Sequence, residues 1–224
     1  MQLSNQLPWE SLGSGNAPDP HLLQCLQFIL ELDKLKQVLR QTTLTDGSRR
    51  ENSAEHSWHI ALMAIALADY AAEPVKVDHA VRLLLLHDVV EIDAGDTFCF
   101  DAHANQSKLE RELEAAERLF GLLPEAVGAT FRALWDEFEA GETPEARFAK
   151  AMDCLQPLLH NLATAGGTWK KHGITCDRVF QRMQPIKQAT PALWGFVESQ
   201  VLASVEAGIL LPAPEKALGI ATRP

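Results

Sequence analysis

The stretch Leu83-Leu84-Leu85-Leu86-His87-Asp88-Val89-Val90-Glu91 decides how this chain folds. It closes a segment, residues 77–90, that is apolar over most of the circumference of a helix, which is typical of a helix deep inside a bundle. His87, Asp88 and Glu91 therefore enter an apolar core together, on neighbouring parts of one predicted helix. A buried carboxylate without a partner costs several kcal/mol, so these side chains need a cation, a basic side chain or specific hydrogen bonds beside them. A bound metal ion would supply that compensation directly.

The flanking sequence also predicts helices. From Leu22 onward, apolar residues recur at helical spacing, and the pattern weakens near Arg40; residues 42–48 are interpreted as a loop. Asn52 followed three residues later by Glu55 is a capping-box pattern and predicts the start of the next helix. No segment alternates convincingly with period two, which argues against a strand-rich fold.

The composition favours one domain. Of the 224 residues, 46% are hydrophobic, enough to form a substantial core. Periodic apolar positions are missing at both ends of the chain. We therefore predict an all-α fold, a helical bundle built from residues 19–206, with an irregular N-terminal segment, residues 1–18, and an irregular C-terminal tail, residues 207–224.

Two further side chains are expected to point toward the same core. His56 shares a helix face with Ile60 and Met63, which turns its imidazole toward the apolar interior. Asp153 lies in a largely apolar helical stretch, where alanines such as Ala149 leave room for a site. Both are natural ligands to add to His87 and Asp88.

Two imidazoles and two carboxylates make a mixed nitrogen and oxygen site, unlike the thiolate cage of a structural zinc. The predicted cofactor is therefore one divalent metal ion, with Mn, Co, Fe, Ni, Zn or Mg all suitable, held by His56, His87, Asp88 and Asp153. Such an ion lowers the pKa of a bound water and neutralises charge on phosphoryl oxygens. The other histidines, among them His59, His103 and His160, are interpreted as ordinary core or surface residues.

The order His56, His87-Asp88, Asp153 resembles the H…HD…D signature of the HD-domain phosphohydrolase superfamily. Within it, residues 50–57 (RENSAEHS) and 87–96 (HDVVEIDAGD) are similar to the 5'-deoxynucleotidase branch, which removes phosphate from deoxyribonucleoside 5'-monophosphates. The likeness covers roughly residues 22 to 165 and implies an HD-domain helical bundle.

The resemblance also implies roles for residues around the ligands. Glu91 and Asp96 take the positions of acidic residues that orient the attacking water, assist proton transfer and contact the sugar, and we expect them to be catalytic. Arg40 is the closest match to the family's arginine before the first histidine, and Arg50 is a second candidate for binding phosphate. Asp96 is followed by Thr-Phe-Cys-Phe rather than a proline-containing turn, which leaves base and sugar preference open.

The predicted function is hydrolysis of (deoxy)ribonucleoside 5'-monophosphates to nucleoside and phosphate by a metal-activated water. Two alternatives stay open: hydrolysis of another phosphoester, such as a cyclic nucleotide or a nucleoside triphosphate, and a non-catalytic HD-type module that binds metal or nucleotide. Dinuclear oxygenases of this superfamily carry extra histidines between the HD pair and the last aspartate. Only His103 lies in that interval, which favours a single metal.

Charge and composition narrow the partners. A formal net charge of -10 disfavours a nucleic-acid polymer and leaves a small phosphorylated substrate, a nucleotide by the resemblance, as the expected partner. The N-terminus does not read as a signal peptide, and the longest apolar run, residues 60–68, is too short to cross a bilayer, so no membrane role is expected. The four cysteines are far apart and fit a reducing cytoplasm. The relatives are commonly dimers, so we expect a homodimer.

Overall fold

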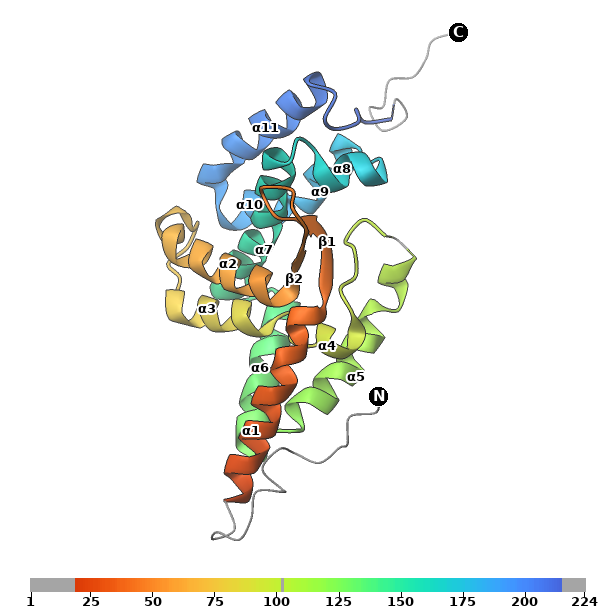
Figure 1. Ribbon diagram of the computed structural model, residues 1–224. Coiled ribbons are helices and arrows are strands. Elements are labelled where there is room, and N and C mark those ends of the chain that lie inside the picture. Colours follow the sequence, from red (N-terminus) through yellow and green to blue (C-terminus); the bar gives the residue numbers. More distant parts are fainter. Residues whose placement is uncertain (1–18, 102, 215–224) are drawn as a thin grey trace, which may run out of the picture.

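The computed structural model describes residues 19–101 and 103–214, and most of them lie in helices. Figure 1 shows α7 running through the middle of the molecule, with α2 and α3 beside it. The prediction of an all-α fold is confirmed. The α-helices are α1 (Pro20–Leu32), α2 (Ser53–Ala66), α3 (Val77–Leu86), α4 (Glu91–Ala94), α5 (Lys108–Phe120), α6 (Glu125–Ala140), α7 (Pro144–Ala163), α8 (Gly167–His172), α9 (Cys176–Arg182), α10 (Gln184–Ala189) and α11 (Trp194–Glu206). Short 3-10 helices are η1 (Asp33–Gln37), η2 (Ala68–Tyr70), η3 (Ala104–Gln106) and η4 (Pro191–Leu193).

The start of α2 follows the predicted capping box. The Asn52 side chain accepts a hydrogen bond from the backbone N–H of Glu55 at 2.9 Å, and the Glu55 carboxylate accepts one from the Asn52 N–H at 3.3 Å. These bonds satisfy backbone donors that the first turn of a helix leaves free. They fix the position of His56, which lies one residue further along and is fully buried.

The buried helix ends earlier than the sequence predicts. α3 stops at Leu86, and residues 87–90 form tight turns before α4 begins at Glu91. Backbone bonds with i to i−3 spacing, such as Glu91 N–H to Asp88 O at 2.9 Å, replace the helical pattern. The expectation that His87, Asp88 and Glu91 share one helix is therefore wrong, although all three side chains are buried.

The break in the helix has a packing reason. Leu83 and Leu84 belong to one apolar cluster, together with side chains of α2, α7 and α9 to α11. Val89 and Val90 belong to a second cluster, formed with α1, α5 and α6. Because the chain has to turn between the two clusters, residues 87 and 88 lie at their junction.

A β-hairpin forms where the sequence predicts the end of a helical pattern and a loop. Strand β1 (Leu39–Thr43) pairs with β2 (Arg50–Asn52) in an antiparallel arrangement, with Leu39 opposite Asn52 and an irregularity in the register. The turn contains Gly47 at a φ of 71°, a conformation that favours glycine. The interpretation of residues 42–48 as a loop was correct for the turn and wrong for its first residues. The sequence pattern did not predict β1, because four of its five residues are polar and show no alternation of apolar and polar residues.

Ordered packing extends beyond Glu206, where the expected tail begins. Leu210 is buried in the first cluster, and the backbone of Leu211 bonds to Ile174 and Cys176. The predicted irregular segment at residues 1–18 and the end of the predicted tail, residues 215–224, lie outside the described residues. In the described part of the chain, no helix combines the length and the apolar character that a membrane crossing requires.

Candidate active site

His56, His87 and Asp88 form a compact buried group. Each offers a nitrogen or oxygen atom, and these atoms all lie within 4.8 Å of one another. The exposed fractions of the three residues are 0%, 6% and 7%. The structure therefore brings together three of the four predicted metal ligands, from α2 and from the turn after α3.

Both histidines are oriented as metal ligands usually are. His87 donates from Nδ1 to the Leu84 carbonyl at 2.7 Å, and its buried Nε2 lies 2.9 Å from Asp88 Oδ1, its neighbour in the chain, without the angles of a regular hydrogen bond. His56 has Nδ1 at 3.3 Å from Gln156 Oε1 and turns Nε2 into the group. An outer hydrogen bond at Nδ1 fixes the ring and leaves Nε2 for a metal. This buried nitrogen, which has no regular hydrogen bond, and the donor set fit a divalent ion of the zinc, cobalt or manganese type.

Asp153, the fourth predicted ligand, contacts His56 without belonging to the compact group. Its Oδ1 lies 3.1 Å from His56 Nε2, and its Oδ2 accepts a hydrogen bond from Arg182 at 2.8 Å. It projects from α7 beside the buried Ala149, as predicted, and Pro157 one turn later removes the N–H that would bond to the Asp153 carbonyl.

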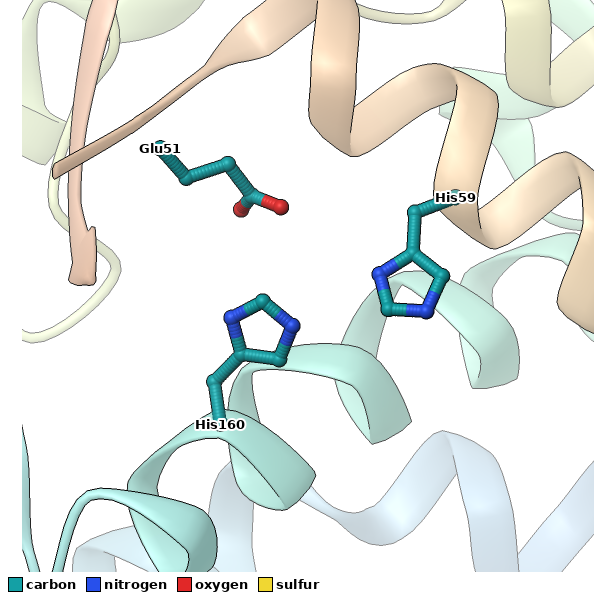
Figure 2. Close-up of side chains that lie close together, drawn as sticks. All are labelled: Glu51, His59 and His160. Atoms are coloured by element: carbon teal, nitrogen blue, oxygen red, sulfur yellow. The ribbon is translucent and has the colours of Figure 1, made fainter. Parts of the chain in front are cut away.

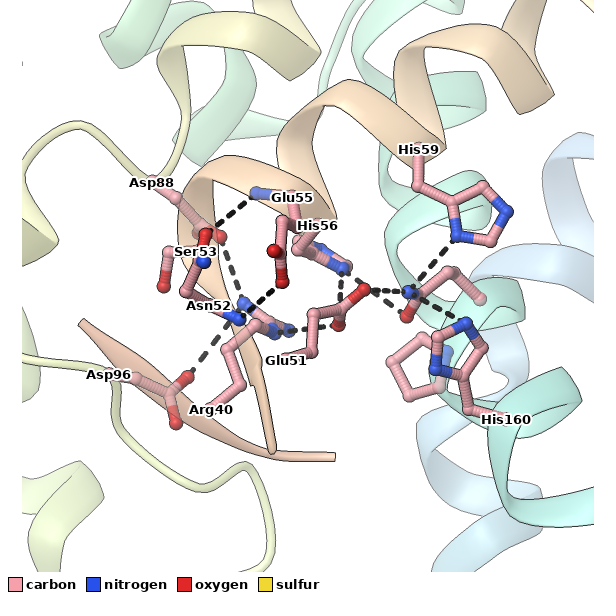
Figure 3. Close-up of polar contacts among 12 residues, drawn as sticks. Arg40, Glu51, Asn52, Ser53, Glu55, His56, His59, Asp88, Asp96 and His160 are labelled. Carbon is pink, nitrogen blue, oxygen red and sulfur yellow. Dashed lines mark hydrogen bonds and ion pairs between the residues drawn. The ribbon is translucent and has the colours of Figure 1, made fainter. Parts of the chain in front are cut away.

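Arg40 lies at the centre of the acidic side chains (Figure 3). Its guanidinium donates to Asp88 Oδ2 at 2.8 Å and lies 3.7 Å from Asp96, 3.8 Å from Glu51 and 3.9 Å from Asp153. Burial alone would lower the pKa of Arg40, but the surrounding carboxylates outweigh burial and raise it. Arg40 is therefore a fixed positive charge at the site.

The protonation states of the ligand pair depend on each other. Burial disfavours protonated His87, but the charge and hydrogen bond of Asp88 outweigh burial and raise the pKa of His87 to about 9. Burial would raise the pKa of Asp88, while His87 and Arg40 hold it well below its usual range. A proton on His87 thus occupies the place in the charge balance that a metal ion would take.

Glu91 and Asp96 lie beside this group with the opposite shift. Glu91 accepts a hydrogen bond from Ser53 at 2.5 Å and is buried, and burial and the charge of Asp88 raise its pKa well above the usual range. Burial also raises the pKa of Asp96, against the opposing charge of Arg40. Two carboxyl groups with raised pKa values next to two with lowered pKa values are a common arrangement for acid and base chemistry.

These side chains line a cavity of about 400 Å³. Its wall also carries cations that the sequence did not single out: Lys108, Lys150 and Arg182. The cavity therefore combines buried acids, candidate metal ligands and positive charges, and its size is suited to a small anionic molecule.

Arg50 lies elsewhere. It is absent from the cavity lining, and its guanidinium donates to the backbone carbonyls of Arg40 and Leu39. In this structure Arg50 braces the hairpin that carries Arg40, so its link to the cavity is indirect.

Sequence reasoning missed three buried or partly buried groups around His56. Glu51 was within the quoted motif but received no role, and Gln156 could have been found one helical turn after Asp153. Arg182 lies on α9, outside the part of the chain that carries the resemblance, and gave no signal.

Comparison with known proteins agrees with this geometry. The chain matches the family described as HD domain over residues 32–194. A crystal structure titled predicted metal-dependent phosphohydrolase, from Magnetospirillum magnetotacticum MS-1, has 52% sequence identity and a TM-score of 0.81, covering 88% of this chain and 100% of that one. The PH0347 protein from Pyrococcus horikoshii OT3 has 21% identity and a TM-score of 0.58 over 79% of this chain and 98% of its own, which shows a common fold.

Among curated proteins, human 5'-deoxynucleotidase HDDC2 is 33% identical over 135 residues. The match covers 60% of this chain and 65% of the human protein, so the chain spans slightly less than two thirds of that relative. The match to the family covers more than half of the chain. It includes every residue of the site described above, from Arg40 to Arg182. The chain therefore belongs to the HD domain family.

Proposed function

We propose that this protein is a metal-dependent phosphohydrolase that releases phosphate from deoxyribonucleoside 5'-monophosphates. The observation that carries the proposal is that His87, Asp88 and Arg40 share one cavity wall, with the buried His56 grouped beside His87 and Asp88. The group offers ligands for a cation, and the arginine offers a partner for a phosphate.

The substrate class is supported by the relatives. The similar human protein is named a 5'-deoxynucleotidase, and the similar Magnetospirillum structure carries the name of a metal-dependent phosphohydrolase. The cavity volume of about 400 Å³ is compatible with a mononucleotide.

In this proposal His56, His87, Asp88 and Asp153 hold one divalent ion, whose identity is open. When bound, such an ion supplies an activated water and neutralises charge on phosphoryl oxygens. Arg40 and Arg182 are each within 3 Å of a ligand carboxylate and are assigned to the phosphate as well.

Two acids with raised pKa values are assigned to the proton transfers. Burial and the charge of Asp88 raise the pKa of Glu91, and a carboxyl group with a raised pKa is suited to give a proton to a leaving alkoxide. Asp96 lies 3.7 Å from Arg40, whose positive charge opposes the rise in its pKa. It is assigned to the attacking water or the sugar. Arg50 is assigned to the support of Arg40.

The proposal is tested with chelator-stripped protein reloaded with Mn, Co, Mg or Zn. Phosphate release is measured from deoxyribonucleoside and ribonucleoside 5'-monophosphates, from a nucleoside triphosphate and from a cyclic nucleotide. We expect turnover of the 5'-monophosphates, with preference for the deoxy sugar, and only with metal. If only triphosphates or cyclic nucleotides were hydrolysed, the assignment of 5'-monophosphates as substrates would be wrong. Metal binding without turnover of any phosphoester would favour a binding module instead.

We also propose a homodimer, formed through α2. Trp58, Leu62 and Ile65 follow one face of this helix, with exposed fractions of 61%, 46% and 56%. Such an apolar stripe on a surface helix is characteristic of protein contacts.

A cytoplasmic location is supported by the four cysteines, all of which are free thiols.

A further inference from the structure

A second group of ligand-type side chains lies next to the first. Glu51 on β2, His59 on α2 and His160 on α7 each turn an oxygen or nitrogen atom toward a common point, and these atoms lie within 4.8 Å of one another (Figure 2). Glu51 and His160 are buried and His59 is partly exposed, which leaves an approach from solvent. None of the three residues lines the cavity of the proposed function.

The orientation of His160 is that of a metal ligand. Its Nδ1 lies 3.0 Å from the carbonyl oxygen of Thr43, which can only accept a hydrogen bond, so Nδ1 carries the proton. The lone pair is then on Nε2, which faces the group. This repeats the arrangement of His87, whose Nδ1 donates to the Leu84 carbonyl.

An amide nitrogen occupies the point where the ligand atoms converge. Nε2 of Gln156 lies 2.5 Å from Glu51 Oε1, 3.1 Å from His160 Nε2 and 3.4 Å from His59 Nδ1. An amide nitrogen has two hydrogens, so it can donate to Glu51 and His160 but not also to the more distant His59 nitrogen. In addition, the other carboxylate oxygen of Glu51 is buried without a hydrogen-bond partner among the described residues. The nearest donors, His56 Nδ1 and Arg40 Nε, lie 3.6 Å and 3.8 Å from that oxygen, which is beyond hydrogen-bond distance, and a cation could bind it more closely.

We propose that Glu51, His59 and His160 form a second metal site, which takes a zinc-class divalent ion. Two imidazoles and one carboxylate are a ligand set of zinc, cobalt and nickel rather than of magnesium or calcium. Ligand atoms lie about 2.0–2.2 Å from zinc, so they must close to about 3.5 Å from one another. From the present arrangement this is a movement of roughly 1 Å, and the Gln156 side chain has to move aside or turn its Oε1 to the ion as a fourth ligand.

The two sites lie on opposite edges of the His56 ring. His56 Nε2 faces the first group, while Nδ1 lies 3.3 Å from Gln156 Oε1 and 3.6 Å from Glu51 Oε2 (Figure 3). When Gln156 moves, Glu51 is the next acceptor for the His56 N–H. The second ion would thus lie on the Nδ1 side of His56, which is a proposed ligand of the first ion. There it would fix the Glu51 carboxylate, which orients the His56 ring.

The test counts metal ions and needs no enzyme assay. Chelator-stripped full-length protein is reloaded with excess zinc, passed over a desalting column and analysed for zinc per chain by mass spectrometry. We expect about two zinc ions for the unaltered protein and about one for His160→Gln. His87→Gln should also retain about one, and the double variant none. His21→Gln, which alters an exposed histidine outside both groups, should retain two.

Cobalt gives an independent spectroscopic readout. Titration of stripped protein with cobalt should develop visible absorption bands up to two equivalents, and His160→Gln should lose one set of bands while the other keeps its shape. Circular dichroism verifies that the variants fold, and His59→Gln, at a partly exposed position, replaces His160→Gln if that variant does not. One zinc in the unaltered protein that is lost in His87→Gln, or two zinc ions retained in both His160→Gln and His59→Gln, would overturn the proposal. These outcomes are independent of whether the protein hydrolyses a nucleotide.

Discussion

Replacing Arg40 with methionine should destabilise the metal-free protein strongly. The guanidinium lies within 4 Å of four carboxylates, Glu51, Asp88, Asp96 and Asp153, and its side chain is only 12% exposed. Methionine keeps much of the length and apolar stem of the side chain and removes the charge. The variant therefore isolates the electrostatic contribution of this residue.

The expected magnitude is worked for a separation of 4 Å, the distance within which all four carboxylates lie. At 4 Å and an effective dielectric constant of about 20, two unit charges interact by about 4 kcal/mol before desolvation is subtracted. Loss of one partner from a buried ion pair typically costs about 3–5 kcal/mol, because the remaining charge stays buried. Since domains of this kind are stable by about 5–15 kcal/mol, we expect Arg40→Met to remove a large part of the stability of the stripped protein.

A metal ion should reverse part of that loss, because it supplies positive charge to the same carboxylates. Zinc should bind Arg40→Met more tightly than the unaltered protein, where the guanidinium repels it. In saturating zinc, the difference in the free energy of unfolding between Arg40→Met and the unaltered protein should shrink by more than about 1.4 kcal/mol. This corresponds to about tenfold tighter zinc binding by the variant.

Urea denaturation at fixed pH, with and without zinc, measures both effects. Arg132→Met is the matched control, since Arg132 pairs with Asp136 on the surface of α6 and contacts the Trp135 ring. That change should cost less than about 1 kcal/mol in either condition. If metal-free Arg40→Met were as stable as Arg132→Met, Arg40 would not be the compensating charge of this site. The same would follow if zinc increased the difference in the free energy of unfolding between Arg40→Met and the unaltered protein.

Three further substitutions test the proposed roles. Glu91→Gln should retain the metal and lower kcat by about 10²–10⁴-fold, as expected for loss of a proton donor; an unchanged rate would make Glu91 a structural residue. Arg182→Met removes a charged hydrogen bond to Asp153 and should raise KM by about tenfold to a hundredfold in steady-state assays, whereas a change in kcat alone would argue against contact with phosphate. Ile65→Glu places a charge on the exposed stripe of α2 and should convert a dimer to a monomer in analytical ultracentrifugation, with zinc content unchanged; a persistent dimer would exclude this face.

The residues proposed as metal ligands stand out in the sequence because each is polar within an apolar helical pattern. His56 follows a capping box that fixes its helix face, and His87 and Asp88 follow four leucines. The same pattern could not predict where α3 ends, since Val89 and Val90 continue the apolar run as well as any helical residue would. Only the presence of a second core, into which these valines pack, explains the turn.

The surroundings of His56 depend on packing that a sequence pattern does not specify. His59 and His160 read as isolated histidines, and they meet only because α2 packs against α7. Arg40 was found through resemblance, but the strand that carries it was not, because its side chains are mostly polar. Arg182 reaches Asp153 from α9, 29 positions further along the chain, and no local pattern connects the two.

The described residues place a positive group wherever the buried carboxylates converge. Arg40 serves Asp88, Arg182 serves Asp153, and the proton on His87 serves the oxygen of Asp88 that faces it at 2.9 Å. A metal ion at the first site would therefore replace the His87 proton rather than fill a neutral space, and its binding would release that proton. At Glu51 the corresponding place is held by the Gln156 amide, which has no charge. Glu51 lies 3.8 Å from Arg40, but its closest contact, at 2.5 Å, is with this neutral amide, and for this reason the second site is expected to attract a cation as well.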